Sequence, residues 1–337
     1  MKRKGNLFAQ VTSFENLCAA AYRAFRGKKL NSGVSPFVFN LEKEVIALHE
    51  ELTQKTYRPL PYGVFEIREP KVRQICSSHF RDRVVHHAIC NVLEPLFEKK
   101  LISDTYACRV GKGNHAAVTK AKGFAKKSRF FLKCDVTKYF PSIDHVILKE
   151  HLAIILKDRE LLDLLYLIID HQVPDNERGK GLPIGNLTSQ HFANLYLSPL
   201  DHFLKDRLRI KQYIRYMDDL LVFENDKDRL WQVLNEIRTY LQQKLHLNLK
   251  EKVTKVAPVR EGVPFLGFRI FDNLVRLQRP NLIRFRKKMR ARERAYLAGR
   301  INELELVQST SSMIAFISHA NTTTLRRKDL ERSMKLV

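Results

Sequence analysis

Two adjacent carboxylates, Asp218 and Asp219, stand between two apolar, β-prone segments. Residues 212–217 precede them and residues 220–223 follow them, a pattern that predicts a strand, a tight turn and a second strand, with the acids at the turn. Neighbouring anions repel one another, and burying them without a cation is costly. Phosphoryl transfer by two divalent ions requires such a carboxylate pair at a rigid tip. A hairpin turn without catalytic function fits the same four residues, so other segments must decide.

A second predicted strand also ends in an acid. Residues 130–136 form an apolar run that contains Asp135, and residues 137–144 predict a turn into a helix. Strand ends that carry Asp135 and Asp218 converge only in a fold that pairs the two strands, such as antiparallel strands backed by helices. The carbonyl oxygen of Val136 is a further candidate ligand, because Mg²⁺ takes oxygen ligands.

The composition points to a polyanionic partner. The 337 residues include 60 Lys and Arg against 36 Asp and Glu, a net charge of +24, with an ordinary hydrophobic content of 44%. No apolar run approaches the ~20 residues of a membrane span, which favours nucleic acid over membrane. Five cysteines without C-x-x-C spacing predict reduced thiols and give no support to a zinc site. The N-terminus lacks an apolar signal segment, so we expect a cytoplasmic protein.

Helices and a hairpin are expected before the first acidic strand. Helical periodicity predicts four helices, at residues 14–27, 41–53, 80–97 and 115–127. Residues 64–67 and 72–76 predict two strands joined by a turn at 69–71. Lys71 and Arg73 on this hairpin suit a triphosphate or a phosphate backbone. A solvated basic turn is the alternative interpretation.

Taken in order, these segments resemble the motifs of reverse transcriptases. Residues 135–140 (DVTKYF) resemble motif A, and residues 216–219 (YMDD) resemble motif C. The remaining motifs follow the same collinear order: fingers motifs at 57–95, motif B at 181–190 (GLPIGNLTSQ), motif D at 247–252 and motif E at 263–268. A single tetrapeptide is weak evidence, but the ordered set, covering roughly residues 57–270, is specific.

This resemblance implies an α+β right-hand polymerase fold. It would comprise fingers, a ferredoxin-like palm with an antiparallel sheet backed by helices, and a short helical thumb. The expected division is residues 1–105 for an N-terminal extension and fingers, 106–274 for the palm with part of the fingers, and 275–337 for the thumb. A chain of this length is expected to lack RNase H, maturase and endonuclease domains.

The resemblance also implies the catalytic residues. Asp135, Asp218 and Asp219, with the Val136 carbonyl, would hold two Mg²⁺ ions, and Asp219 is either a direct ligand or an outer residue. Phe140 stands where the family has its steric gate, a ring beneath the sugar that excludes a 2′-hydroxyl. A core aromatic is the alternative for Phe140, whereas Tyr139 is expected to face the core.

Further residues are expected to contact nucleotide and primer. Lys71, Arg73, Phe140, Ile184, Gln190 and Lys252 are the nucleotide-binding candidates, and Phe265, Leu266 and Gly267 correspond to the primer grip. Lys252, a candidate proton donor to pyrophosphate, could equally be a surface lysine. In the C-terminal region, a basic helix face is expected to bind template and primer through Arg284, Lys287, Lys288 and Arg292. Leu282, Phe285, Met289, Tyr296 and Leu297 are expected to form its apolar face against the palm.

Motif B indicates a subtype. Group II intron and retron enzymes usually carry Gln-Gly-x-x-x-Ser-Pro, whereas this chain has Ile184 and Gln190 at the first and last positions. This variant resembles the reverse transcriptases of diversity-generating retroelements, which occur in bacteria and phages. The resemblance implies error-prone copying of a template-repeat RNA into cDNA that is mutated at template adenines. The implied partners are template RNA, a cDNA or primer strand, dNTPs and a small, basic, oligomeric accessory variability protein, with no membrane.

Two other functions remain open at this point. One is a stand-alone antiviral-defence reverse transcriptase on the same fold. The other is a nucleic-acid-binding scaffold with a decayed site, against which the three intact aspartates argue. An RNA-dependent RNA polymerase is disfavoured because Phe140 should exclude ribonucleotides.

Overall fold

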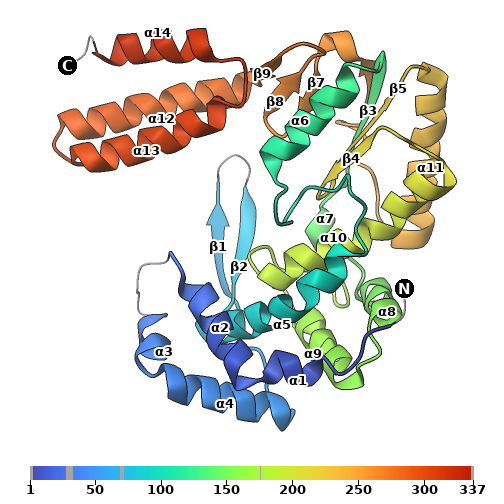
Figure 1. Ribbon diagram of the computed structural model, residues 1–337, viewed down its shortest axis with the longest axis vertical. Coiled ribbons are helices and arrows are strands. Elements are labelled where there is room, and N and C mark those ends of the chain that lie inside the picture. Colours follow the sequence, from blue (N-terminus) through green and yellow to red (C-terminus); the bar gives the residue numbers. More distant parts are fainter. Residues whose placement is uncertain (1–2, 28–32, 69–71, 175, 335–337) are drawn as a thin grey trace. The chain divides into compact units, whose positions relative to one another are not determined.

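The computed structural model describes residues 3–27, 33–68, 72–174 and 176–334 (Figure 1). The chain forms two compact units. Unit 1 comprises residues 1–103, 136–209 and 235–250, and unit 2 comprises residues 104–135, 210–234 and 251–337. Helix α11 (Lys227–Leu245) contributes residues to both. The division of the chain into fingers, palm and thumb at residues 105 and 274 stays a prediction.

Unit 1 is mostly helical. Its first helices are α1 (Phe8–Thr12), α2 (Phe14–Phe25), α3 (Ser35–Phe39), α4 (Leu41–Thr53) and α5 (Phe80–Glu98). The later ones are α7 (Tyr139–Ser142), α8 (His145–Ile155), α9 (Arg159–Asp170), α10 (Leu187–His202) and the π-helical turn Phe203–Arg207. Helix α5 packs against both α2 and α10. The helices predicted at 14–27, 41–53 and 80–97 are therefore confirmed.

A two-stranded hairpin also belongs to unit 1. Strands β1 (Gly63–Ile67) and β2 (Arg73–Ser77) pair antiparallel, with Ile67 opposite Arg73. Both strands were predicted, within one residue at each end. The predicted turn at 69–71, with Lys71, lies outside the described residues.

The central element of unit 2 is a four-stranded antiparallel sheet in the order β4-β5-β3-β6. The strands are β3 (Phe130–Asp135), β4 (Tyr213–Tyr216), β5 (Asp219–Glu224) and β6 (Lys255–Pro258). Helix α6 (Asn114–Ala125), predicted at 115–127, packs against β4 through a continuous apolar core that includes Ala121, Phe131, Ile214 and Phe223. The β3–β5 register sets Asp135 directly opposite Asp219. The strands predicted on both sides of Asp218, and the strand that ends at Asp135, are confirmed.

A smaller antiparallel sheet completes this core. It consists of β7 (Val263–Phe265), β8 (Phe268–Ile270) and β9 (Val275–Leu277), and α6 also packs against β8. The inward residues Phe265, Phe268 and Ile270 are fully buried in the same core as the α6 residues.

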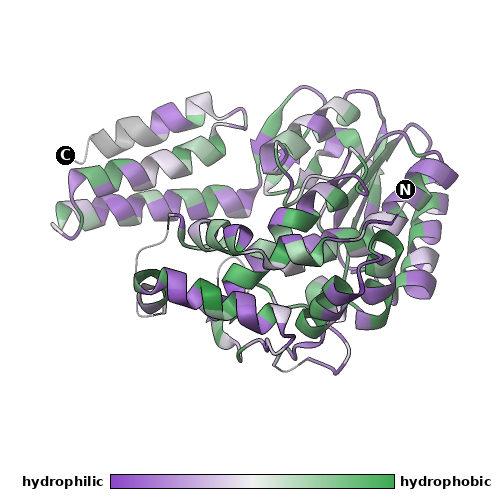
Figure 2. Ribbon diagram, turned by 60° about the horizontal axis from the view of Figure 1, so that its bottom comes forward, coloured by the Kyte–Doolittle hydropathy of each residue, from purple (hydrophilic) through white to green (hydrophobic). Residues whose placement is uncertain are grey.

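Three helices follow: α12 (Arg279–Leu297), α13 (Glu303–Ile317) and α14 (Thr323–Met334). Helix α12 is rich in hydrophilic residues, whereas the strands of the four-stranded sheet are mostly hydrophobic (Figure 2). Phe285 and Met289 of α12 pack against Ile317 of α13. The predicted apolar face is wrong at the C-terminal end of α12, where Tyr296 and Leu297 are exposed. The last α12 residue in the apolar cluster with α13 is Met289. Within the described residues, we find no helix that combines the length and the apolarity needed to span a membrane.

Candidate active site

The β4–β5 hairpin presents Asp218 at its tip. The two-residue turn is Met217–Asp218, and Met217 has a φ of 55°, the left-handed backbone that a tight hairpin turn needs. Arg215, fully buried, donates from Nη1 to the carbonyl of Met217 at 2.9 Å. Its backbone N–H donates to the carbonyl of Asp104 at 3.0 Å, and its carbonyl accepts from the N–H of Tyr106 at 3.0 Å. The buried guanidinium of Arg215 therefore fixes the backbone of the turn that carries Asp218.

Asp135 and Asp218 form a closely coupled carboxyl pair. Burial, and then the charge of Asp135, raise the pKa of Asp218 to about 7, and the two side chains share a hydrogen bond. The neighbouring carboxylate disfavours the ionised form of Asp218. A cation bound between the two groups would favour the ionised form of both. Two half-buried oxygen donors match the ligand preference of Mg²⁺, so the residues present fit a divalent ion. Within the described ranges, no group of three or more His, Cys, Asp and Glu side chains is already assembled as a metal cluster.

Asp219 is engaged by a lysine. The Lys133 ammonium lies 3.0 Å from each carboxylate oxygen of Asp219 and also donates to the carbonyl of Pro264 at 3.0 Å. The side chains of Lys133 and Asp219 are 15% and 21% exposed, so this pair is mostly shielded from water. Asp219 thus has a cation of the protein beside it.

The predicted primer-grip residues form the β7–β8 turn. Phe265 is fully buried, so its ring serves the core, and Leu266 and Gly267 have φ values of 47° and 87°. The Gly267 carbonyl accepts from the Gln278 N–H and from Asn281 Nδ2, both at 3.0 Å. The φ of Gly267 favours glycine here, and a Cβ would also stand 2.1 Å from Asn281 Nδ2, whose side chain would have to move. The turn is consequently tied to the start of α12.

The basic candidates of unit 2 lie on its surface. Lys252 is exposed in a turn before β6. On α12, Lys287, Lys288 and Arg292 are exposed, and the half-buried Arg284 donates to Asn281 Oδ1 at 3.2 Å. Their exposure leaves these side chains accessible to a polyanion.

In unit 1, the segment after Asp135 is bound to two other segments. Val136 is buried and bridges to Leu249, and the Thr137 N–H donates to the carbonyl of Asn248 at 2.9 Å. The Phe140 carbonyl accepts from the N–H of Leu182 at 2.9 Å. Motif A is thereby joined by backbone hydrogen bonds to segments of motifs D and B.

Phe140 and its neighbour have different environments. Tyr139 is buried, as predicted, and its hydroxyl donates to the carbonyl of Ala193 in α10. Phe140 is half-buried, with its ring edge-on to Tyr139 at a centroid distance of 5.8 Å. Of the two rings, only that of Phe140 is available to a ligand.

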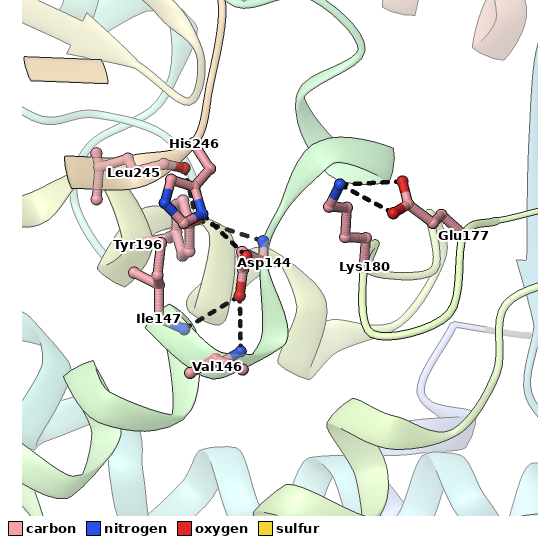
Figure 3. Close-up of polar contacts among 8 residues, drawn as sticks. All are labelled: Asp144, Val146, Ile147, Glu177, Lys180, Tyr196, Leu245 and His246. Carbon is pink, nitrogen blue, oxygen red and sulfur yellow. Dashed lines mark hydrogen bonds and ion pairs between the residues drawn. The ribbon is translucent and has the colours of Figure 1, made fainter. Parts of the chain in front are cut away.

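Asp144 anchors the helix after Phe140 (Figure 3). Its Oδ1 accepts from the N–H groups of Val146 and Ile147 at 2.9 and 3.3 Å, the N-cap geometry of α8. Its Oδ2 lies 3.1 Å from His246 Nδ1, just after α11. These partners lower the pKa of Asp144 in spite of its partial burial.

Tyr196 of α10 joins the same cluster. Its hydroxyl accepts from the Asp144 N–H at 3.3 Å and donates to the Leu245 carbonyl at 2.7 Å. In the nearby loop, the Lys180 ammonium forms an ion pair with Glu177 at 3.0 Å (Figure 3). The backbone of Lys180 forms an isolated antiparallel β-bridge with Asp144. Three helices of unit 1 therefore meet at the end of motif A.

The motif B loop lies against the β1–β2 hairpin. The Ile184 carbonyl accepts from the Cys76 N–H at 2.9 Å, and a Cβ at Gly185, whose φ is 134°, would stand 2.6 Å from the Cys76 carbonyl. Ile184 is half-buried, Gln190 is half-buried in the first turn of α10, and Arg73 is exposed at the start of β2. Glycine thus permits the contact between the loop and β2.

Sequence reasoning missed several supporting residues. Lys133 and Arg215 looked like ordinary strand residues, although a cation two positions before Asp135 on the same strand face was a usable signal. The hydrogen bond of 2.6 Å from Ser78 Oγ to Asn186 Oδ1, buried in unit 1, joins residues too distant in sequence to be paired by pattern.

Comparisons with known proteins agree on one family. The profile of the reverse transcriptase family (RNA-dependent DNA polymerase) matches residues 67–270. Protein YkfC of Escherichia coli is 24% identical, over 68% of this chain and 72% of its own length. The group II intron-encoded protein LtrA of Lactococcus lactis is 21% identical, over 68% of this chain and 50% of its own.

Solved structures give the same fold. The apo telomerase of Candida tropicalis superposes with a TM-score of 0.53 at 13% identity, over 80% of this chain and 59% of that one. The Candida albicans telomerase in complex with a telomeric RNA fragment has a TM-score of 0.50 at 12% identity, over 83% and 60%. The predicted right-hand polymerase fold is confirmed by these similarities.

Proposed function

Because the chain belongs to the reverse transcriptase (RNA-dependent DNA polymerase) family, we propose that it copies RNA into DNA by two-metal nucleotidyl transfer at Asp135 and Asp218. The observation that carries this proposal is the coupled carboxyl pair at the ends of β3 and the β4–β5 turn, where burial and mutual repulsion raise the pKa of Asp218 to about 7. When both groups are ionised they repel each other, and a bound cation relieves that repulsion.

The protein's own residues have distinct parts in this chemistry. Two Mg²⁺ ions, when bound, supply activation of the primer 3′-hydroxyl and charge stabilisation on the triphosphate. Asp135 and Asp218 would hold them, and Arg215 keeps the tip that presents Asp218 in place. Exposed Arg73 is suited to the triphosphate, because a guanidinium donates in a planar fork. The β7–β8 turn would position the primer end, and the exposed cations of α12 would bind the phosphate backbone.

Primer extension tests this activity. Wild type, Asp218→Asn and the exposed surface control Asp228→Asn would be assayed on an RNA template with a DNA primer, Mg²⁺ and four dNTPs. We expect Asp218→Asn to lose at least ~10³-fold in rate, because the amide cannot hold the cation that stabilises the transition state. Asp228→Asn should match wild type. Extension that survives in Asp218→Asn would contradict the assignment.

We further propose that the enzyme is the mutagenic reverse transcriptase of a diversity-generating retroelement. Ile184 supports this subtype, since its side chain offers shape but neither donor nor acceptor to report the geometry of a base pair. In this role it would use a template-repeat RNA, with a basic oligomeric accessory protein as partner, in the cytoplasm of a bacterium.

Sequencing the cDNA decides the subtype. Errors concentrated opposite template adenines, obtained with the template-repeat RNA and the accessory protein present, would support it. Accurate or repetitive cDNA under the same conditions would instead support an antiviral-defence reverse transcriptase. Nucleic-acid binding without any product, under every condition, would favour a non-catalytic scaffold.

A further inference from the structure

Lys133 occupies a place that an ordinary strand lysine does not. Its side chain is only 15% exposed, yet its ammonium meets two different strands, at the Asp219 carboxylate of β5 and the Pro264 carbonyl of β7. Removing an ammonium from water is costly, and these charge-assisted contacts offset that cost. The arrangement is therefore specific to this position rather than a solvated surface pair.

The backbone register explains why Lys133 reaches these partners. Asp135 lies opposite Asp219 in the β3–β5 ladder, and Lys133, two residues earlier, is on the same face of β3 as Asp135. Lys133 is thus a diagonal neighbour of Asp219 across the ladder. Pro264 directly precedes Phe265 in β7, whose turn at Leu266 and Gly267 was assigned to the primer grip. One side chain joins the acidic cluster to that strand.

We propose that Lys133 is a positioning residue that holds Asp219 beside the divalent-ion site and couples that site to β7. With its two oxygens at 3.0 Å from the ammonium, Asp219 serves as an outer partner, and Asp135 and Asp218 remain as the direct ligands. The two sites are coupled because the same ammonium contacts both. A displacement of β7 at Pro264 would move the Lys133 ammonium and so change its distance from the Asp219 carboxylate. This inference rests on the proposed function, since it concerns the same ion site.

Loss of the lysine charge has opposite effects on ion binding and on turnover. Lys133→Met removes the ammonium beside Asp219 and makes the cluster more negative by one charge, so Mn²⁺ should bind the protein without nucleotide or nucleic acid about 10-fold more tightly. In primer extension the same variant should lose turnover and require a higher primer concentration, because Asp219 and β7 are no longer held together. Lys133→Arg keeps the charge and should stay within about 3-fold of wild type in ion affinity.

The direct experiment is an Mn²⁺ titration followed by electron paramagnetic resonance, without nucleotide or nucleic acid. Wild type, Lys133→Met, Lys133→Arg and Lys255→Met would be compared. Lys255 is a matched control: it lies opposite Lys133 in the β3–β6 ladder, and its ammonium lies over the Phe131 ring. Tighter binding by Lys133→Met alone supports the proposal. Equal or weaker binding by Lys133→Met, or an equal change in Lys255→Met, overturns it.

A double-mutant cycle isolates the contact. In Asp219→Asn, Lys133→Met should raise the Mn²⁺ affinity clearly less than it does in wild type, and an undiminished effect would overturn the proposal. Should Lys133→Met fail to fold by circular dichroism, Lys133→Gln carries the same test. The titration needs no catalysis, so it measures the effect of Lys133 on Mn²⁺ affinity even if wild type shows no polymerase activity. Failure of the proposed function is therefore distinguishable from failure of this inference.

Discussion

The adjacent aromatic residues Tyr139 and Phe140 differ in the exposure of their side chains. The Tyr139 ring is buried, and its hydroxyl donates a hydrogen bond to the Ala193 carbonyl. Phe140 is half-buried, and its backbone carbonyl accepts a hydrogen bond from the Leu182 N–H. A partly exposed ring can act as a wall against a sugar substituent. The same sequence position would serve only the core if the two exposures were exchanged.

Replacing Phe140 by Val should admit ribonucleotides. The smaller side chain leaves room for a 2′-hydroxyl, so the efficiency of ribonucleotide incorporation relative to deoxynucleotide should rise by at least about 10-fold. Single-nucleotide extension with matched rNTP and dNTP measures the ratio. Phe39→Val, at a ring 82% exposed, is the control for loss of an aromatic. An unchanged ratio would return Phe140 to a packing role.

Replacing Ile184 by Gln should make copying more accurate. The amide restores a donor and an acceptor beside the loop that contacts β2, so mismatched pairs should be extended about 3- to 10-fold less often. Error frequency in sequenced cDNA is the readout. Ile184→Leu, which keeps an apolar side chain of equal size, should retain the wild-type frequency. If both variants copy alike, Ile184 only packs the loop.

At the scale of elements, α5 and α10 are joined by a buried polar contact. His86 of α5 lies with Nδ1 2.9 Å from Thr188 Oγ1 of α10, and both residues are buried where the two helices pack together. Burial, and then the nearby His87 and His171, lower the pKa of His86 from 6.5 to about 3. The folded protein therefore keeps this imidazole neutral where the unfolded chain would protonate it.

Acid should weaken this contact. Because the folded pKa of His86 lies below the unfolded one, the unfolded state binds more protons, and stability falls as the pH drops below about 6.5. Between pH 7.5 and pH 5, His86 should cost about 2 kcal/mol of unfolding free energy. Urea denaturation at both pH values would measure the loss, and His86→Asn, which keeps a polar group toward Thr188, should lose about 2 kcal/mol less. The exposed His79→Asn should behave as wild type; equal losses in all three proteins would contradict the assignment.

At the scale of the whole molecule, the net charge of +24 indicates a polyanionic partner. Part of it is exposed on α12, where Lys287, Lys288 and Arg292 lie outside the apolar cluster formed with α13. Cations placed this way bind phosphates without sequence preference and release counterions on binding.

A triple substitution of Lys287, Lys288 and Arg292 by Ala should therefore reduce salt dependence along with affinity. The slope of log K against log salt for an RNA–DNA duplex should become shallower by roughly 2 to 3. Fluorescence anisotropy between low and moderate salt measures it. Ala substitutions at Lys43, Lys227 and Lys244, which are exposed on other helices, should change the slope less. Equal changes in the two triples would indicate a diffuse charge effect.

Local pattern determined much of this protein. Apolar, β-prone runs predicted β3, β4 and β5, helical spacing predicted α4 at its observed ends, and the order of motifs predicted the polymerase fold. These features depend on contacts within a few residues, which periodicity records directly. The sequence also placed Asp135 and Asp218 at strand ends, and hence in reach of each other once β3 pairs with β5.

Only the tertiary structure decided which buried groups are partners. Lys133 and Asp219 are 86 residues apart, and Lys133 and Pro264 are 131 apart, so no local period links them. The same holds for Phe265, expected at the primer but buried in the core, and for Tyr296 and Leu297, whose exposure follows from where α13 packs. Periodicity reports which face of an element is apolar, but the register of a sheet and the packing of a neighbouring helix determine what that face meets.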